Sequence, residues 1–223
     1  MIRTAHVVGA GRVGSALAAR LAERGVSVSP SSDGVELVLL CVPDRAIAEV
    51  AAALEPGPWI AHVSGATPLA ALDPHVRRFG VHPLQTFTRS RGAEQLDGAY
   101  AAVTAETDEA RRAGFELAEL LGLAPFPLAD ERRDAYHAGA AVASSYLVTL
   151  RRAAGLLLES AGAPPEALDP LMRRTIENGF EPTGPIVRGD WATLDAHLAA
   201  VRRERPELEP LVTALAEATK ALT

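Results

Sequence analysis

Hydrophobic residues in the first half of the chain form short runs that alternate with helical patterns. Apolar runs at residues 4–8, 36–43 and 59–65 contain β-branched residues, which is typical of strands buried on both faces. Segments 13–25 and 107–122 instead place apolar residues three and four positions apart, which predicts amphipathic helices. Repeated strand and helix units of this kind predict a mainly parallel sheet covered by helices on both faces.

The pattern changes at Glu131. From Glu131 to Gly162 the chain has no proline and is dense in alanine and leucine, which predicts one helix of about 30 residues. Further helical patterns follow at residues 166–180, 191–206 and 207–222. We therefore expect an α/β domain at residues 1–130 and an all-α C-terminal domain at residues 131–223.

Composition and charge exclude several classes of function. The chain has 223 residues, enough for two modest domains, and its net charge of −6 argues against a nucleic-acid or anionic-membrane partner. No apolar run reaches the about 20 residues of a membrane span. The sequence starts directly with a strand, so we expect no signal peptide. The lone Cys41 excludes an internal disulfide, and no cluster of ligand residues indicates a metal. We expect a cytoplasmic protein.

The peptide AHVVGAGRVGSALAARL contains three glycines with the spacing G-x-G-x-x-G, directly after an apolar run. Gly9 allows the tight turn, Gly11 leaves room for a pyrophosphate, and Gly14 lets the helix pack on the strand. The N–H groups at the start of this helix, which includes Arg12 and Val13, carry a partial positive charge. With a strand before it and a helix after it, the motif predicts a Rossmann-like domain that binds NADP or NAD.

The segment that should hold the adenosine half of the cofactor is short. The peptide VSVS at residues 26–29 is a candidate for the second strand of the domain. The usual fingerprint has an acidic residue at the end of the second strand, but Asp33 lies beyond that strand, in SPSSDG. About eight residues separate the second strand from the third, fewer than the dozen of a normal parallel crossover. Ser29 and Ser31 offer hydroxyls to a 2′-phosphate, so the choice between NAD and NADP stays open, and we expect a weak affinity.

A family resemblance rests on motifs that occur in this order: VVGAGRVGSALA, LCVPDRAI, HVSGA, GVHPLQTF, DAYHAGAAVASSYLVTL and TGPIVRGDWATLDAHL. With them the chain resembles a bacterial family of Rossmann-like proteins with a C-terminal helical domain of unknown function. That family is related to the 6-phosphogluconate dehydrogenase, ketopantoate reductase and pyrroline-5-carboxylate reductase superfamily. The resemblance covers nearly the whole chain and implies NADP or NAD as cofactor and dimerisation through the helical domain. The chain departs from the family at Ser145, where asparagine is usual, and at the short segment after the second strand.

The resemblance also implies cofactor contacts at Cys41, Val42 and Pro43, because this stretch lies along the nicotinamide ribose in the related dehydrogenases. We expect contact through backbone groups. The alternative is a strand end followed by a proline-initiated turn, with Cys41 as a small buried hydrophobic residue. A nucleophilic thiol is not expected, since nothing nearby in the sequence would lower its pKa.

Two histidines are candidates for proton transfer to a carbonyl substrate, a step that histidine can perform near pH 7. His82 follows a strand at the carboxyl edge of the sheet, and His137 lies where the superfamily places a catalytic lysine and asparagine. At helical spacing His137 shares a face with Ala141, Ser144 and Val148, so Ser144 is a candidate substrate ligand. For each histidine the alternative is a structural role with the ring bonded to the backbone.

The loop TGPIVRGD supplies one more candidate ligand. Asp190 is expected to cap the helix that follows. Arg188 is a candidate to bind a carboxylate or phosphate of the substrate, or to pair with Asp190.

Together these features favour an NAD(P)-dependent oxidoreductase that transfers hydride to or from a small carbonyl or imine compound in a cleft between the domains. The alternative is a non-catalytic nucleotide-sensing or scaffold dimer that retains a degenerate Rossmann fold. An acyl or nucleotidyl transferase on this scaffold is a third class. The nearly uncharged stretch Ala138–Leu150 presents apolar residues on more than one helix face, so we expect a homodimer through the C-terminal domain.

Overall fold

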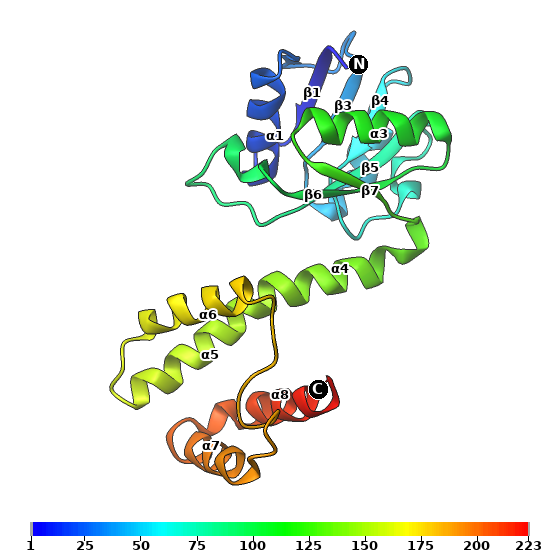
Figure 1. Cartoon of the computed structure of the whole chain (residues 1–223). Helices are drawn as coiled ribbons and strands as arrows, with labels where there is room; N and C mark the ends of the chain where they lie inside the picture. The colour runs from blue at the N-terminus through cyan, green and yellow to red at the C-terminus, as the bar shows by residue number, and fades with distance from the viewer. Residues whose placement is uncertain (1, 223) are drawn as a thin grey trace. The chain divides into compact units, whose positions relative to one another are not determined.

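The computed structural model describes residues 2–222. Its contacts divide the chain into two compact units, Met1–Ala141 and Val142–Thr223. The first unit contains a seven-stranded sheet with flanking helices, and the described part of the second unit is helical (Figure 1). This confirms the predicted fold class, a mainly parallel α/β sheet followed by an all-α part. The change from strands to helices occurs at the 3₁₀ turn η4, Asp130–Arg132, near the predicted boundary at residue 131. The boundary between the two compact units instead follows Ala141, within the long helix that begins at η4.

The strands lie in the order β2-β1-β3-β4-β5-β6-β7. Their bounds are β1 Thr4–Val8, β2 Ser27–Ser29, β3 Leu37–Leu40, β4 Trp59–His62, β5 Arg78–Leu84, β6 Tyr100–Thr104 and β7 Ala124–Pro127. Neighbouring strands are parallel except β5 and β6, which pair antiparallel with Val81 opposite Val103. β7 was not predicted from the sequence, because Pro125 and Pro127 argue against a strand. An edge strand tolerates these prolines, since it needs no ladder partner on its outer side.

The helices of the first unit are α1 Arg12–Glu23, α2 Ile47–Ala52, α3 Asp108–Leu120 and α4 Arg133–Ala141, with 3₁₀ turns η1 Asp44–Ala46, η2 Leu69–Leu72, η3 Ala93–Leu96 and η4 Asp130–Arg132. Those of the second unit are the π-helical turn η5 Val142–Tyr146, α5 Leu147–Ser160, α6 Leu168–Glu177, α7 Trp191–Glu204 and α8 Glu209–Leu222, with 3₁₀ turns η6 Pro165–Ala167 and η7 Pro206–Leu208. Asp190 caps α7 as predicted, because its carboxylate accepts a hydrogen bond from Thr193 N at 3.1 Å.

The core of the first unit lies on both faces of β3. Leu37 and Leu39 belong to the cluster that packs under α1 and α3 on one face of the sheet (Figure 1). Val38 and Leu40 point to the other face and pack with Ile47 of α2. This burial on both faces explains the continuous apolar run of β3, which lies between β1 and β4 in the sheet.

The connection from β2 to β3 contains no helix, as the short segment predicted. Ser31 and Asp33 instead form a tight turn, in which Ser31 Oγ donates to Asp33 Oδ2 at 3.2 Å. The backbone N–H of Ser31 also donates to Ser29 Oγ at 3.2 Å. The two candidate serines thus bond within their own turn, and their contact with a cofactor stays a prediction.

The long helix is continuous from Asp130 to Ser160 and includes the π turn η5. A π turn holds more residues than an α turn, so the α-helical spacing that placed Ser144 and Val148 on the face of His137 does not apply across it. By length and composition this helix could cross a membrane, which is weak evidence because core helices pass the same test. Its uncharged stretch runs only from Ala138 to Leu150, short of the about 20 residues of a span.

Several large apolar side chains of the second unit are exposed: Val142, Tyr146, Val148, Leu171, Ile176, Phe180 and Trp191. Where exposed apolar side chains form a contiguous patch, they are typical of a protein interface. The homodimer expected from the sequence stays a prediction, and light scattering at micromolar concentration would check it.

Candidate functional site

The three glycines of the first loop differ in what surrounds them. A Cβ on Gly9, whose φ is +111°, would collide with the Cys41 carbonyl, and one on Gly14 would collide with the Gly9 carbonyl. These two positions therefore require glycine for the packing of the chain itself. At Gly11 the φ of −76° suits any residue, and a Cβ would meet no atom within 4 Å. The open space lies at the N-terminus of α1, where free N–H groups favour an anion.

Cys41 is a packing residue beside this loop. Burial raises the pKa of its thiol to about 12, so the thiol stays protonated at neutral pH. This agrees with the expectation that Cys41 is not a nucleophile. Val42 and Pro43 follow at the end of β3, where Pro43 precedes the 3₁₀ turn η1. They lie at the carboxyl edge of the sheet, next to the strand that leads into the glycine loop.

The structure brings His82 of β5 and His137 of α4 together. Their ring centroids are 6.5 Å apart, and the rings meet edge to face. Both pack on Gly65, which follows β4, since a Cβ there would lie 3.0 Å from His137 Cδ2 and from His82 Cε1. His82 is half-buried and His137 is exposed. If the histidines had only a structural role, their rings were expected to bond to the backbone. Within residues 2–222 neither ring forms such a bond, and their catalytic role stays a prediction.

Tyr136 is a site residue that sequence analysis missed. Its hydroxyl lies 2.6 Å from His82 Nδ1. Burial, followed by the nearby His137, lowers the pKa of His82 to about 4, and burial raises the pKa of Tyr136 to about 12. At neutral pH the imidazole is therefore uncharged and the phenol protonated. A phenol is a stronger acid than a neutral imidazole, so Tyr136 donates to Nδ1 and the His82 hydrogen lies on Nε2.

The loop that follows β4 is held from two sides. Ser64 Oγ donates to Asp44 Oδ2 at 2.8 Å and accepts from Thr67 N at 2.9 Å. The buried Arg133 donates from Nη1 to the Ser64 carbonyl at 3.0 Å and from Nε to Asp130 Oδ1 at 2.6 Å. Because Arg133 begins α4, the same contacts fix the helix turn that carries His137. This arrangement depends on long-range contacts that no local sequence pattern indicates.

Contacts along the carboxyl edge of the sheet join the glycine loop to the two histidines. Gly9 packs on Cys41, the last residue before Val42 and Pro43. Asp44 then bonds to Ser64, and Gly65 lies against both histidine rings. The carboxyl edge of an open parallel sheet is where such folds bind their ligands.

His62 lies at the end of β4 and is 0% exposed. Neither of its ring nitrogens has a hydrogen-bond partner among the residues that the structure describes. Burial, followed by the charge of Arg133, lowers the pKa of His62 to about 3. The ring is therefore neutral throughout the physiological range.

These two histidines predict acid sensitivity. The pKa values of His62 and His82 in the folded chain, about 3 and about 4, lie below their ordinary value of 6.5, so the unfolded chain binds more protons. Their contribution to stability is present above pH 6.5 and is lost as the pH falls towards 4. The free energy of unfolding should fall by up to about 1.4 kcal/mol per pH unit for each histidine. Denaturant unfolding at pH 7.5 and pH 5 measures this loss.

The variant His62→Leu should lose about half as much unfolding free energy between pH 7.5 and pH 5 as the wild type. The control His197→Leu, at an exposed position of α7, should lose as much as the wild type. Equal pH dependence in the His62→Leu variant and the wild type would contradict the assignment of the loss to this buried ring.

Ser144 and Arg188 both lie in the second unit. Ser144 is in the π turn η5, and Arg188 is exposed in the loop before α7. Hydrogen bonds from Thr193 lower the pKa of Asp190. Within residues 2–222 Arg188 and Asp190 form no ion pair, so their pairing stays a prediction. Contact of either residue with a substrate stays a prediction.

Within residues 2–222 no group of three or more His, Cys, Asp or Glu residues is arranged to hold a metal.

Solved structures share this fold over nearly their whole length. A Bacteroides fragilis protein provisionally described as an NADP oxidoreductase has a TM-score of 0.80 at 20% identity, with 99% of this chain and 98% of that chain covered. A Thermotoga maritima protein has a TM-score of 0.73 at 23% identity, with 97% and 99% covered. The 1-pyrroline-5-carboxylate reductase of Streptococcus pyogenes has a TM-score of 0.61 at 15% identity, with 98% of each chain covered. At these identities the likeness shows the fold, which is Rossmann-like.

No curated protein matches the chain. The family model described as "Domain of unknown function (DUF2520)" matches residues 99–219. This segment includes the motifs YHAGAAVASSYL and GPIVRGD, on which the resemblance rested. The match spans more than half of the sequence and confirms the resemblance to a family with a domain of unknown function. The chain belongs to the DUF2520 family.

Proposed function

We propose that the chain is an NAD(P)-dependent oxidoreductase that transfers hydride to or from a small carbonyl or imine compound. The observation that carries this proposal is the open space at Gly11, which neither the backbone conformation nor the packing of the chain explains. A phosphate group that approaches the N-terminus of α1 does explain it. The NADP oxidoreductase and the 1-pyrroline-5-carboxylate reductase of similar fold support the same reaction class.

The residues at the carboxyl edge of the sheet fit such a cofactor. The backbone N–H groups of Arg12 and Val13 would hold the diphosphate, and the strand end at Cys41, Val42 and Pro43 would lie along the nicotinamide ribose. When bound, the nicotinamide would supply or accept the hydride. Ser29 and Ser31 would face the adenosine ribose, where the short segment after β2 offers little other contact. We therefore propose a weak affinity and leave the choice of NAD or NADP open.

The two histidines would have different roles at the substrate. As a carbonyl or imine is reduced, its oxygen or nitrogen must gain a proton. We assign proton donation to His137, because His82, with a pKa of about 4, is uncharged at neutral pH. The Nε2–H of His82 would donate a hydrogen bond to the same substrate atom. Tyr136 would keep this hydrogen on Nε2 by donating its own hydroxyl hydrogen to Nδ1.

A thermal-shift screen with NADH and NADPH, repeated with small carbonyl acids, tests the proposal. A cofactor at 100 times its Kd should stabilise the folded chain by about 2.7 kcal/mol. With the correct substrate, oxidation of the reduced dinucleotide should follow in an absorbance assay. No shift at millimolar dinucleotide would remove the basis of the proposal. Binding without turnover for any carbonyl or imine would favour the non-catalytic nucleotide-sensing alternative.

A further inference from the structure

A cavity of about 290 Å³ lies between the first turn of α1 and the segment that follows β5. Gly11, Arg12 and Ser15 line it on the side of α1, and Arg89 and Arg91 line it on the side of that segment. The cavity thus brings three arginines from distant parts of the sequence next to the glycine whose open space is unexplained.

The charges around this cavity are unbalanced. Its lining contains no carboxylate among the residues that the structure describes. Arg91 has one long contact, 3.4 Å from its Nε to the exposed Glu94, and Arg12 donates to the Phe87 carbonyl at 3.5 Å. For Arg89 no ion pair occurs within residues 2–222. Three like charges around one cavity repel each other, and an anion between them would relieve that repulsion.

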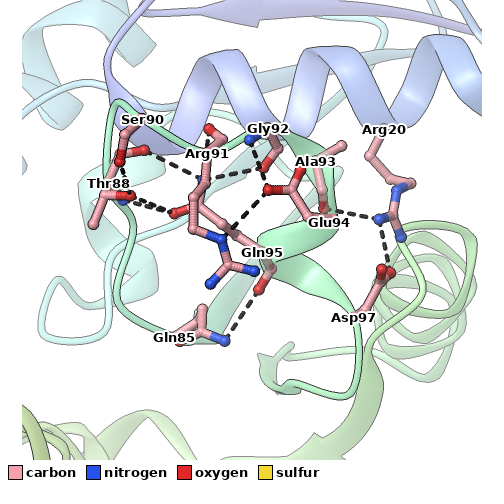
Figure 2. Close-up of polar contacts among 10 residues, drawn as sticks. All are labelled: Arg20, Gln85, Thr88, Ser90, Arg91, Gly92, Ala93, Glu94, Gln95 and Asp97. Carbon is pink, nitrogen blue, oxygen red and sulfur yellow. Dashed lines mark hydrogen bonds and ion pairs between the residues drawn. The ribbon is translucent and has the colours of Figure 1, made fainter.

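The segment that carries Arg89 and Arg91 is held by a buried glutamine. Gln95 is 3% exposed, and its Nε2 donates to the carbonyls of Arg91 at 2.9 Å and Gly92 at 3.0 Å (Figure 2). Its Oε1 accepts from the N–H of Thr88 at 2.7 Å. One buried amide therefore fixes the backbone on both sides of Arg89. Buried polar groups with satisfied hydrogen bonds make a segment rigid.

A buried arginine ties the same segment to α1. Arg20 of α1 is 5% exposed, and its Nη2 donates to the Ala93 carbonyl and to Asp97 Oδ1, both at 2.8 Å (Figure 2). Its Nη1 donates to the Leu121 carbonyl at 3.0 Å. Because α1 forms the opposite wall, these bonds fix the two walls of the cavity relative to each other. The guanidinium groups of the cavity are thus carried on a preformed frame, as a binding site requires.

We propose that this cavity binds a diphosphate group, with Arg89 and Arg91 as a second wall facing the α1 N-terminus. The proposal rests on the proposed function for the source of the diphosphate, the nicotinamide dinucleotide. Guanidinium groups recognise phosphate oxygens through charge-assisted, often bidentate hydrogen bonds. The contacts explain how the chain would hold the cofactor although its adenosine segment is short. They also predict that NADH and NADPH depend equally on the two arginines, since both carry the diphosphate.

The test compares the double variant Arg89→Gln/Arg91→Gln with Arg111→Gln/Arg112→Gln, which removes the same charge from exposed positions of α3. Calorimetry measures the binding of inorganic pyrophosphate, NADH and NADPH, and circular dichroism checks the fold. We expect the first variant to lose pyrophosphate binding and to bind both dinucleotides at least 10-fold more weakly, as the loss of charged hydrogen bonds implies. The second variant should bind all three like the wild type.

Three results would overturn the proposal. The first is unchanged affinity in Arg89→Gln/Arg91→Gln, which would leave the proposed function standing. The second is a loss for NADPH alone, which would assign the arginines to the 2′-phosphate. The third is a wild-type chain that binds dinucleotide but no pyrophosphate at millimolar concentration. Failure of the wild type to bind any dinucleotide, with pyrophosphate binding that needs both arginines, would refute the proposed function and still support the diphosphate site.

Discussion

Replacement of His137 by alanine should lower turnover about 100- to 10,000-fold, the usual contribution of a general acid. His137 is exposed and lies against His82, whose low pKa prevents it from taking over as a proton donor at neutral pH. Cofactor affinity should hardly change, because the glycine loop would hold the other half of the dinucleotide. Steady-state kinetics with a substrate from the screen would show a lower kcat at nearly unchanged Kd for the cofactor.

The pH dependence separates proton donation from a structural role. A proton donor must be protonated to act, so the wild-type rate of reduction should fall as the pH rises, and His137→Ala should lose this dependence. If His137 were instead a structural residue, the variant would melt at a lower temperature and keep its activity per folded molecule. Melting temperature and turnover measured on the same sample distinguish the two roles.

Aspartate at position 11 should abolish dinucleotide binding. It would put a side chain and a negative charge into the open space at the start of α1, where the diphosphate is proposed to lie. The fold should persist, because the φ of −76° suits any residue and no atom lies within 4 Å of the new Cβ. Calorimetry with NADH and NADPH measures the loss, and circular dichroism verifies the fold.

Two control variants make this test specific. Gly11→Ala adds only a methyl group to the open space and should fold normally. Gly14→Ala should fail to fold, since its Cβ would overlap the Gly9 carbonyl oxygen. A folded Gly11→Asp variant that binds dinucleotide like the wild type would contradict the proposed position of the diphosphate.

Most of the fold could be predicted because its elements follow local periodicity. β3 is apolar at every position since it is buried on both faces, and Thr107 and Asp190 mark helix starts through their side-chain caps. β7 was missed because its prolines are tolerated only at a sheet edge, which is a property of the tertiary structure. The π turn η5 was missed as well, because its own residues, VASSY, include no proline or glycine that would mark it.

The site was predictable only in part. The sequence indicated His82 and His137 separately, one at a strand end and one on a helix, and their contact through Gly65 depends on how β4, β5 and α4 pack. The bond between Tyr136 and His82, 54 positions apart, has no local signal. The same holds for Arg20, which reaches Leu121 across 101 positions. Such contacts become visible only when the topology brings the elements together.

A crystal structure of the chain with millimolar NADPH would show where the dinucleotide binds. We expect a dinucleotide along the carboxyl edge of β1, β3 and β4, with its diphosphate on the backbone N–H groups that follow Gly11. The nicotinamide would pass Pro43 and end beside His82 and His137. A dinucleotide bound elsewhere, or bound with its nicotinamide directed away from both histidines, would contradict the proposed oxidoreductase site.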